Sequence, residues 1–184
     1  YFCTSAESDR LAKVIFLGKQ RMNPDRVGQS PEVLAGLAQF SIPPKTRILV
    51  SEETEIGWHR PLSAEKLNPV LAFYVANDEG HALELANNIA KFEGWGHSSV
   101  VHSNDPKIVA KFASIPTGRV LVNTPAILGG MGYSTDLEPS FMLGTGTWSG
   151  SITSDNVTAL HLINIKRVAY ESRPWRDIYE EYGE

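Results

Sequence analysis

Short apolar runs alternate with stretches of helical period along the first two thirds of the chain, and this alternation constrains the fold more than any other feature. The strand-like runs cover residues 46–53, 69–76, 97–103 and 119–125. The helical patterns cover residues 5–17, 31–40, the stretch after Asp78 and residues 105–115, and a loop is expected at 19–30. Such alternation is typical of βαβ units. The sequence therefore predicts an α/β fold with a mainly parallel sheet and flanking helices.

The helix after Asp78 has the clearest pattern. Asp78 is a suitable N-cap, and four apolar residues follow at spacings that place them on one face of a helix. These residues are Ala82, Leu85, Ala86 and Ile89. We expect this face to be buried against the sheet.

The last third of the chain has a different character. Residues 126–158 are rich in Gly, Ser and Thr and have no sustained period, which is unusual for so long a connection. Four large apolar residues interrupt this stretch and favour a loop held by the fold over a disordered linker. They are Phe141, Met142, Leu143 and Trp148. A strand is then predicted at 161–170 and a short helix at 174–182.

Composition bounds the class of protein. The chain has 184 residues, enough for one domain, with a formal charge of −4 and a pI near 5.8. This charge, without any basic block, argues against nucleic acid or an anionic membrane as a partner. A single cysteine excludes an internal disulfide framework and is in keeping with a reducing cytoplasm, where we expect the protein to be located. No apolar run is long enough to span a membrane, and the first residues do not form a signal peptide.

The only cysteine, Cys3, stands directly before a helix start. Thr4 and Glu7 have the spacing of a capping box, so a thiol at residue 3 would feel the positive end of the helix dipole, which lowers a cysteine pKa. Cys3 could thus be a nucleophile. It could equally be a small apolar residue that packs beside the helix start. The local sequence leaves both readings open.

Other candidate chemistry is weaker. The five histidines have no metal-ligand spacing, so no metal site is expected. The segment GGMGYS resembles a phosphate loop but is not followed by a helix pattern, and GTWSGS only partly matches a nucleophile elbow. His97 follows two glycines at a strand start, where it could face a site or simply cap the preceding helix. Glu65 reads locally as a surface residue.

Three segments taken together carry a family resemblance. They are EKLNPVLAFY (65–74), RVLVNTPAILGGMG (119–132) and LGTGTWSGSITSDNVTALHLINIKRVA (143–169). In order and spacing they resemble the C-terminal part of the catalytic domain of CoA-acylating aldehyde dehydrogenases, including the aldehyde half of bifunctional aldehyde-alcohol dehydrogenases. RVGQSPEVLAGLAQFSIP and GHSSVVHS look like the same family, so the resemblance covers nearly the whole chain.

The resemblance implies a reaction and its cofactors. The family oxidises a small aldehyde to an acyl-CoA with reduction of NAD or NADP, with coenzyme A as co-substrate. A cysteine thiolate forms a thiohemiacetal with the aldehyde, and the thioester that follows is passed to CoA. Glu65 would contact the nicotinamide ribose. Leu67 stands where the wider superfamily has an aromatic residue that packs near the nicotinamide ring.

The resemblance also assigns substrate and partner contacts. His97 would face the cleft that CoA enters, and the glycine-rich stretch 129–150 would form a wall of the aldehyde pocket, with Phe141 and Trp148 as apolar surface. The strand at 161–170 would pair with a neighbouring subunit, which implies a homo-oligomer.

The family order also bears on Cys3. The family nucleophile lies upstream of the stretch that YFCT resembles, so Cys3 would fall too late to be the catalyst. We expect the chain to be a fragment that lacks the nucleophile and the nucleotide-binding domain, with no activity alone. Two alternatives are an enzyme that uses Cys3 with His97 as base, and a non-catalytic assembly module. The resemblance distinguishes neither NAD from NADP nor acetaldehyde from propionaldehyde or a charged aldehyde.

Overall fold

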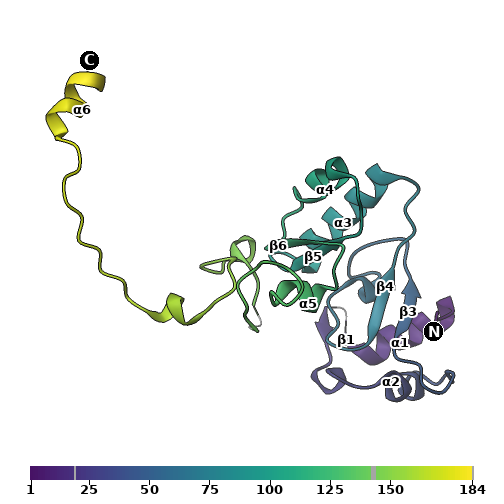
Figure 1. Ribbon diagram of the computed structural model, residues 1–184. Coiled ribbons are helices and arrows are strands. Elements are labelled where there is room, and N and C mark those ends of the chain that lie inside the picture. Colours follow the sequence, from purple (N-terminus) through teal and green to yellow (C-terminus); the bar gives the residue numbers. More distant parts are fainter. Residues whose placement is uncertain (19, 142–143, 184) are drawn as a thin grey trace.

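The structure is a computed structural model that describes residues 1–18, 20–141 and 144–183. Its first half is built on a parallel pair of strands, β3 (Leu49–Glu52) and β4 (Val70–Phe73), as the sequence predicts (Figure 1). The register pairs Leu49 with Val70. Tyr1 to Cys3 lie along the other edge of β3, where the Val50 N–H donates to the Tyr1 carbonyl and the Cys3 N–H to the Val50 carbonyl, both at 2.8 Å. The start of the chain is therefore a short parallel edge of this sheet.

Two helices cover this first unit. Helix α1 (Ser5–Ile15) contacts both β3 and α2 (Pro31–Leu37). The buried cluster beneath them contains the apolar faces of both helices and of both strands. Its members are Leu11, Ile15, Phe16, Leu34, Ala38, Leu49, Leu62, Ala64 and Val70. Burial of these side chains is the main favourable contribution to folding in this half.

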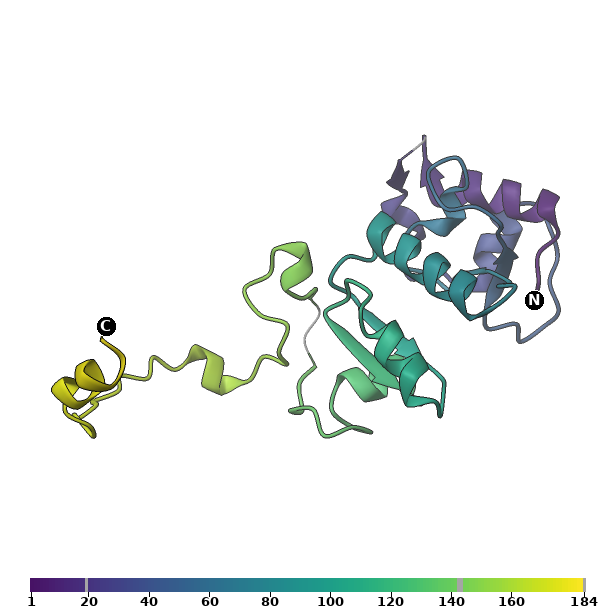
Figure 2. The ribbon, with the colours of Figure 1, turned by 90° about the horizontal axis from the view of Figure 1, so that it is seen from above.

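The second half contains a separate parallel pair, β5 (Ser98–Val101) and β6 (Arg119–Val122). Helix α3 (Glu79–Glu93) precedes β5, α4 (Pro106–Phe112) connects the two strands, and α5 (Ala126–Gly130) packs on both of them. Figure 2 shows these elements beside the first unit. The α/β class with parallel strands and flanking helices is thus confirmed, with the four longer described strands divided into two parallel pairs.

Four local expectations need correction. The first helix ends at Ile15 because the chain turns there into β1 (Phe16–Leu17), which pairs antiparallel with β2 (Arg21–Met22). Residues 19–30 were expected to be loop only. On α3, Ala82 at the start of the helix is exposed while Ala90 near its end is buried, so the expected apolar face is packed only toward the C-terminal end. Helix α5 lies in the stretch expected to have no regular structure. Met142 and Leu143 of that stretch lie outside the described residues.

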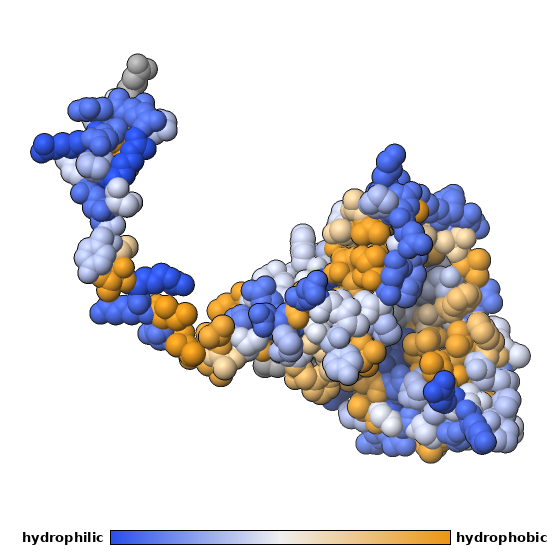
Figure 3. Space-filling view, in the orientation of Figure 1, coloured by the Kyte–Doolittle hydropathy of each residue, from blue (hydrophilic) through white to orange (hydrophobic). Residues whose placement is uncertain are grey.

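The final segment leads away from the rest of the molecule (Figures 1 and 2). Residues 159–183 are exposed throughout; they contain one short 3-10 helix, Ala159–Leu162, and α6 (Trp175–Tyr182). The helix expected at 174–182 is confirmed. The strand expected at 161–170 is not formed in the single chain, because its backbone N–H and C=O groups have no neighbouring strand with which to pair. Figure 3 shows apolar residues at the surface along this segment.

No helix within the described ranges has both the length and the apolar character needed to cross a membrane.

Candidate functional site

The structure brings together two side chains that are 32 positions apart in the sequence. The His97 Nε2 atom lies 3.3 Å from Glu65 Oε1, and the two side chains are 43% and 47% exposed. Glu65 follows the short helix Pro61–Ser63, and His97 follows the end of α3. The contact lies within ion-pair distance and joins a carboxylate oxygen to the Nε2 edge of the imidazole. The resulting pair is accessible to a ligand from solvent.

Glycine backbone packing fixes the position of His97. Gly96 has a φ of +76°, which only glycine adopts without strain, and it turns the chain from α3 into β5. The Gly118 N–H donates to the His97 carbonyl at 2.9 Å, and the Gly146 N–H donates to the Gly96 carbonyl at 2.8 Å. A Cβ atom on Gly118 would lie only 2.4 Å from the Gly96 carbonyl oxygen. The backbone at His97 is therefore held in place by hydrogen bonds from Gly118 and from Gly146 of the glycine-rich segment.

The second ring nitrogen of His97 is buried. Nδ1 has no hydrogen-bond partner among the described residues. The Nε2 edge of the ring therefore contacts Glu65, while the Nδ1 edge is turned away from solvent.

Glu65 and His97 line one cavity of about 340 Å³. Its other walls are the residues around Lys66, the end of β4 with Tyr74, and the last turn of α3 with Glu93. The cavity combines apolar side chains with a few polar groups, as small-molecule sites do. Its size is sufficient for part of a large cofactor or for a small substrate.

Two titratable groups in this cavity have shifted pKa values. Burial lowers the pKa of the Lys66 ammonium to about 8, against an opposing effect of the Glu53 carboxylate. Burial raises the pKa of the Tyr74 phenol to about 12, so this hydroxyl is neutral across the physiological range. The sequence does not single out Lys66, which lies between Glu65 and Leu67 and carries no motif of its own.

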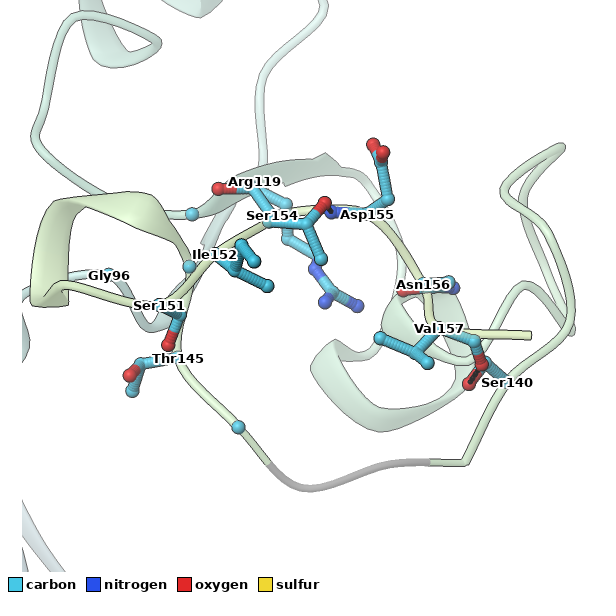
Figure 4. A pocket seen from close by; sticks show the side chains of 14 residues that line it. Gly96, Arg119, Ser140, Thr145, Ser151, Ile152, Ser154, Asp155, Asn156 and Val157 are labelled. Carbon is cyan, nitrogen blue, oxygen red and sulfur yellow. Dashed lines mark hydrogen bonds between the residues drawn. The ribbon is translucent and has the colours of Figure 1, made fainter. Parts of the chain in front are cut away.

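A second cavity of about 180 Å³ lies beside the glycine-rich segment (Figure 4). Arg119 at the start of β6 lines it, and its Nη1 donates to the Gly130 carbonyl at 2.7 Å. Figure 4 shows the Arg119 side chain directed into this cavity, beneath the segment that carries Ser154 and Asn156. The remaining wall is formed mainly by hydroxyl-bearing residues and glycines from the stretch 140–157. The cavity is therefore small and has a mainly polar wall. Arg119 was not among the site residues predicted from the sequence.

The remaining predicted site residues lie on the surface of this chain. Leu67 is 56% exposed, Phe141 76% and Trp148 59%. Phe141 and Trp148 line neither of the two cavities described above. Their assignment to cofactor and aldehyde contacts stays a prediction.

Cys3 does not have the surroundings of an activated thiol. Burial raises its pKa to about 11, with a further increase from the Glu7 carboxylate. The side chain is partly buried and packs against the apolar cluster under α1. The capping box that made Cys3 a candidate is present, but its glutamate opposes ionisation of the thiol. The groups that shift the pKa of Cys3 include no histidine, and His97 contacts Glu65.

Comparison with known proteins places this geometry in context. No family model matches the chain. The aldehyde-alcohol dehydrogenase of Clostridium acetobutylicum is 39% identical over 175 residues, which is 92% of this chain and 20% of the relative. The chain thus spans about a fifth of the length of that curated relative.

Solved structures share the fold closely. An acetylating aldehyde dehydrogenase from Geobacillus thermoglucosidasius superimposes with a TM-score of 0.87 at 40% identity, covering 95% of this chain and 38% of that one. A probable aldehyde dehydrogenase from Listeria monocytogenes EGD-e gives a TM-score of 0.88 at 42% identity, covering 97% and 40%. With this level of identity and a shared fold over nearly its whole length, the chain is homologous to acylating aldehyde dehydrogenases and matches part of their length.

Proposed function

We propose that the protein is the C-terminal portion of the catalytic domain of an enzyme that converts a small aldehyde and CoA to an acyl-CoA with reduction of NAD(P). The observation that carries this proposal is the contact between Glu65 and His97 at one cavity. The family resemblance assigns the cofactor ribose to the first residue and the CoA cleft to the second. The contact between the two side chains is independent of both assignments and therefore supports them.

The residues around Glu65 fit a ribose and a nicotinamide. The carboxylate of Glu65 is about half exposed and can accept hydrogen bonds from ribose hydroxyl groups. Leu67 and Leu71 present apolar surface beside it. The cavity of about 340 Å³ accommodates a part of a dinucleotide, and the rest would extend outside it. When bound, NAD(P) supplies the acceptor for the hydride that leaves the aldehyde carbon.

The role of His97 in this proposal is to line the cleft that CoA enters. Glu65 and the glycine contacts hold its ring in one orientation, so it presents a defined polar edge to a thiol that approaches the cavity. Holding reactive groups in place is a large part of catalysis by proximity. Phe141 and Trp148 would supply apolar surface to the aldehyde pocket once further parts of the enzyme complete it.

The reaction also requires a cysteine nucleophile, and we propose that it lies outside residues 1–184. The raised pKa and the core packing of Cys3 support this view. An assay of NAD reduction with acetaldehyde and CoA should show no turnover for the chain, and none for a Cys3→Ala variant. Turnover that is lost on Cys3→Ala would instead make Cys3 the nucleophile.

A chimeric enzyme tests the proposal directly. Residues 1–184 would replace the matching segment of the Geobacillus thermoglucosidasius enzyme, to which they align over 95% of their length. We expect NAD(P) reduction that requires both an aldehyde and CoA. In the chimera, Glu65→Gln should raise the KM for NAD(P) by about tenfold, because a charged hydrogen bond to the ribose is lost.

The matched control is Glu93→Gln, which removes a carboxylate from the same cavity on the α3 side. This variant should leave the KM for NAD(P) within about twofold of the unsubstituted chimera. A folded chimera without aldehyde- and CoA-dependent turnover would contradict the proposed reaction. Equal effects of the two substitutions would contradict the specific role of Glu65.

We further propose that residues 161–170 form a strand that pairs with a second subunit. Large apolar side chains in and beside this segment are exposed in the single chain, including Leu162, Ile165 and Val168. Their exposure together with unpaired backbone groups favours addition to the edge of another sheet. The same segment is the basis of the alternative in which the chain serves only in assembly.

A further inference from the structure

We propose that Lys66 is a second reactive group in the cavity of Glu65 and His97, an amine that captures small aldehydes as an imine. The inference goes beyond the proposed function, because imine formation needs neither CoA, nor NAD(P), nor a cysteine. The family resemblance gives Lys66 no role.

The contacts of Lys66 match a neutral amine. Its Nζ donates to the Ala64 carbonyl at 2.9 Å and to the Leu62 carbonyl. A neutral amine has two N–H groups, so these two carbonyls satisfy both and leave the lone pair free. An ammonium has a third N–H that also needs an acceptor. Lys66 takes part in no ion pair within the described part of the chain.

Of the charged groups around Lys66, the Glu53 carboxylate favours the ammonium form, but its effect on the pKa is smaller than that of burial. Glu65 is engaged with His97, and Glu53 is engaged with Arg60 at 2.7 Å. Tyr74 and Glu93 also line the cavity, and the Tyr74 phenol is neutral. Burial therefore has the larger effect on Lys66 and lowers its pKa to about 8. With this pKa, roughly a tenth of the amine is unprotonated and nucleophilic at pH 7, far more than of an ordinary exposed lysine.

The chemistry needs only an aldehyde. The Nζ lone pair attacks the carbonyl carbon, and the oxygen takes up a proton to give a carbinolamine. Loss of water then forms the C=N bond, with the two amine hydrogens leaving on the carbonyl oxygen as water. The cavity of about 340 Å³ accepts a small aliphatic aldehyde. Because the product occupies space beside Glu65, the adduct would also compete with ligands that bind there.

Reductive trapping tests the proposal on the complete chain of 184 residues. The protein would be treated with acetaldehyde and cyanoborohydride, which transfers hydride to the imine carbon and leaves a stable secondary amine. Peptide mass mapping then measures the adduct at each lysine. We expect Lys66 to be modified about tenfold faster at pH 7.5 than Lys91 or Lys111, because exposed lysines are protonated at that pH. Lys111 is a stringent control, since the Glu79 carboxylate raises its pKa.

The pH dependence separates the cavity from general lysine reactivity. The rate of modification at Lys66 should reach half of its maximum near pH 8, whereas the rate at Lys111, whose pKa is raised by the Glu79 carboxylate, should still rise above pH 9. Modification of Lys66 at or below the rate of Lys91 with acetaldehyde would overturn the proposal and make Lys66 a structural donor to the two carbonyls. Neither result depends on the proposed dehydrogenase reaction.

Discussion

At the scale of single residues, the Glu53 carboxylate shows how this chain accommodates a buried charge. Glu53 is 3% exposed, and it accepts hydrogen bonds from Ser51 Oγ and from Arg60 Nε, each at 2.7 Å. Ser51 is itself buried and is also hydrogen-bonded to Ser8 on α1. Since a buried carboxylate without a partner is costly, these contacts tie α1, β3 and the Arg60 turn to one another.

Removing the arginine should therefore be strongly destabilising. We expect Arg60→Ala to lower the free energy of unfolding by about 3 kcal/mol, because it leaves the Glu53 carboxylate buried without its cation. Urea unfolding followed by circular dichroism would measure the change. Asp9→Asn is the matched control, since Asp9 lies 3.9 Å from Arg60 and its side chain is 61% exposed. That control should change stability by no more than about 0.5 kcal/mol. Equal losses for both variants would contradict this account of Glu53.

Cys3 gives a pH dependence with a definite sign. The folded state raises the pKa of this thiol from 9.0 to about 11, so folding favours the neutral form. The corresponding stabilisation is fully present below pH 9 and is lost as the pH rises toward 11, because the unfolded chain ionises first. We expect the stability difference between the wild type and Cys3→Ala to be larger at pH 7.5 than at pH 10.5 in urea titrations. A difference that grows with pH would show that the thiolate is the favoured form in the fold.

The residues of the candidate site were only partly predictable from the sequence. Glu65 and His97 are identifiable through the family resemblance, but their contact depends on how α3 and the Pro61–Ser63 turn pack. Lys66 escaped notice because its partners are backbone carbonyls, which leave no pattern in the sequence. Arg119 contacts the Gly130 carbonyl in the same way.

At the scale of elements, a helix or strand could be predicted from the sequence where residues close together in the chain stabilise it. Helix α1 was predictable because its capping box and the helical spacing of its apolar residues both occur within one short stretch of the chain. Strands β1 and β2 have two residues each, too few to show an alternating pattern. Helix α5 begins after Pro125 without a side-chain cap and ends in two glycines, so it depends on packing against β5 and β6.

The capping box of α1 gives a prediction at this scale. The Thr4 N–H donates to Glu7 Oε2 at 2.7 Å, and the Glu7 N–H donates to Thr4 Oγ1 at 3.3 Å. Thr4→Ala removes the side-chain acceptor and should lower the free energy of unfolding by about 1 kcal/mol. Thr4→Ser retains the hydroxyl and should stay within a few tenths of the wild type. Thermal and urea unfolding of both variants would measure the effect, and equal stabilities of the Ala and Ser variants would contradict it.

At the scale of the whole molecule, the α/β class could be predicted because the order of strands and helices is set along the chain. The division of the strands into two parallel pairs could not, since it depends on which strand edges meet in space. Residues 161–170 show a further limit. Their strand propensity is local, but a strand exists only with a partner, and the single chain offers none within the described residues.

This segment determines the expected behaviour of the chain in solution. If residues 161–170 pair with a second subunit, the complete chain should have a molar mass above that of the 20.3 kDa monomer in light scattering. A chain that ends at Thr158 lacks this segment and α6 and should be monomeric. Replacing Ile165 and Val168 together by Lys should have the same effect without shortening the chain. A monomeric complete chain would contradict pairing through this segment.

The contact among Gly96, Gly118 and Gly146 has a consequence for how the sequence can vary. Each of these positions leaves no room for a side chain, since a Cβ atom on any of them would lie within 3.0 Å of another atom. In a saturation mutagenesis library, these three positions should tolerate almost no replacement, although none of them carries a functional group. Neighbouring exposed positions such as Ser114 should accept most residues. The backbone packing that positions His97 would then appear in the library as three glycine positions, far apart in sequence, that accept almost no other residue.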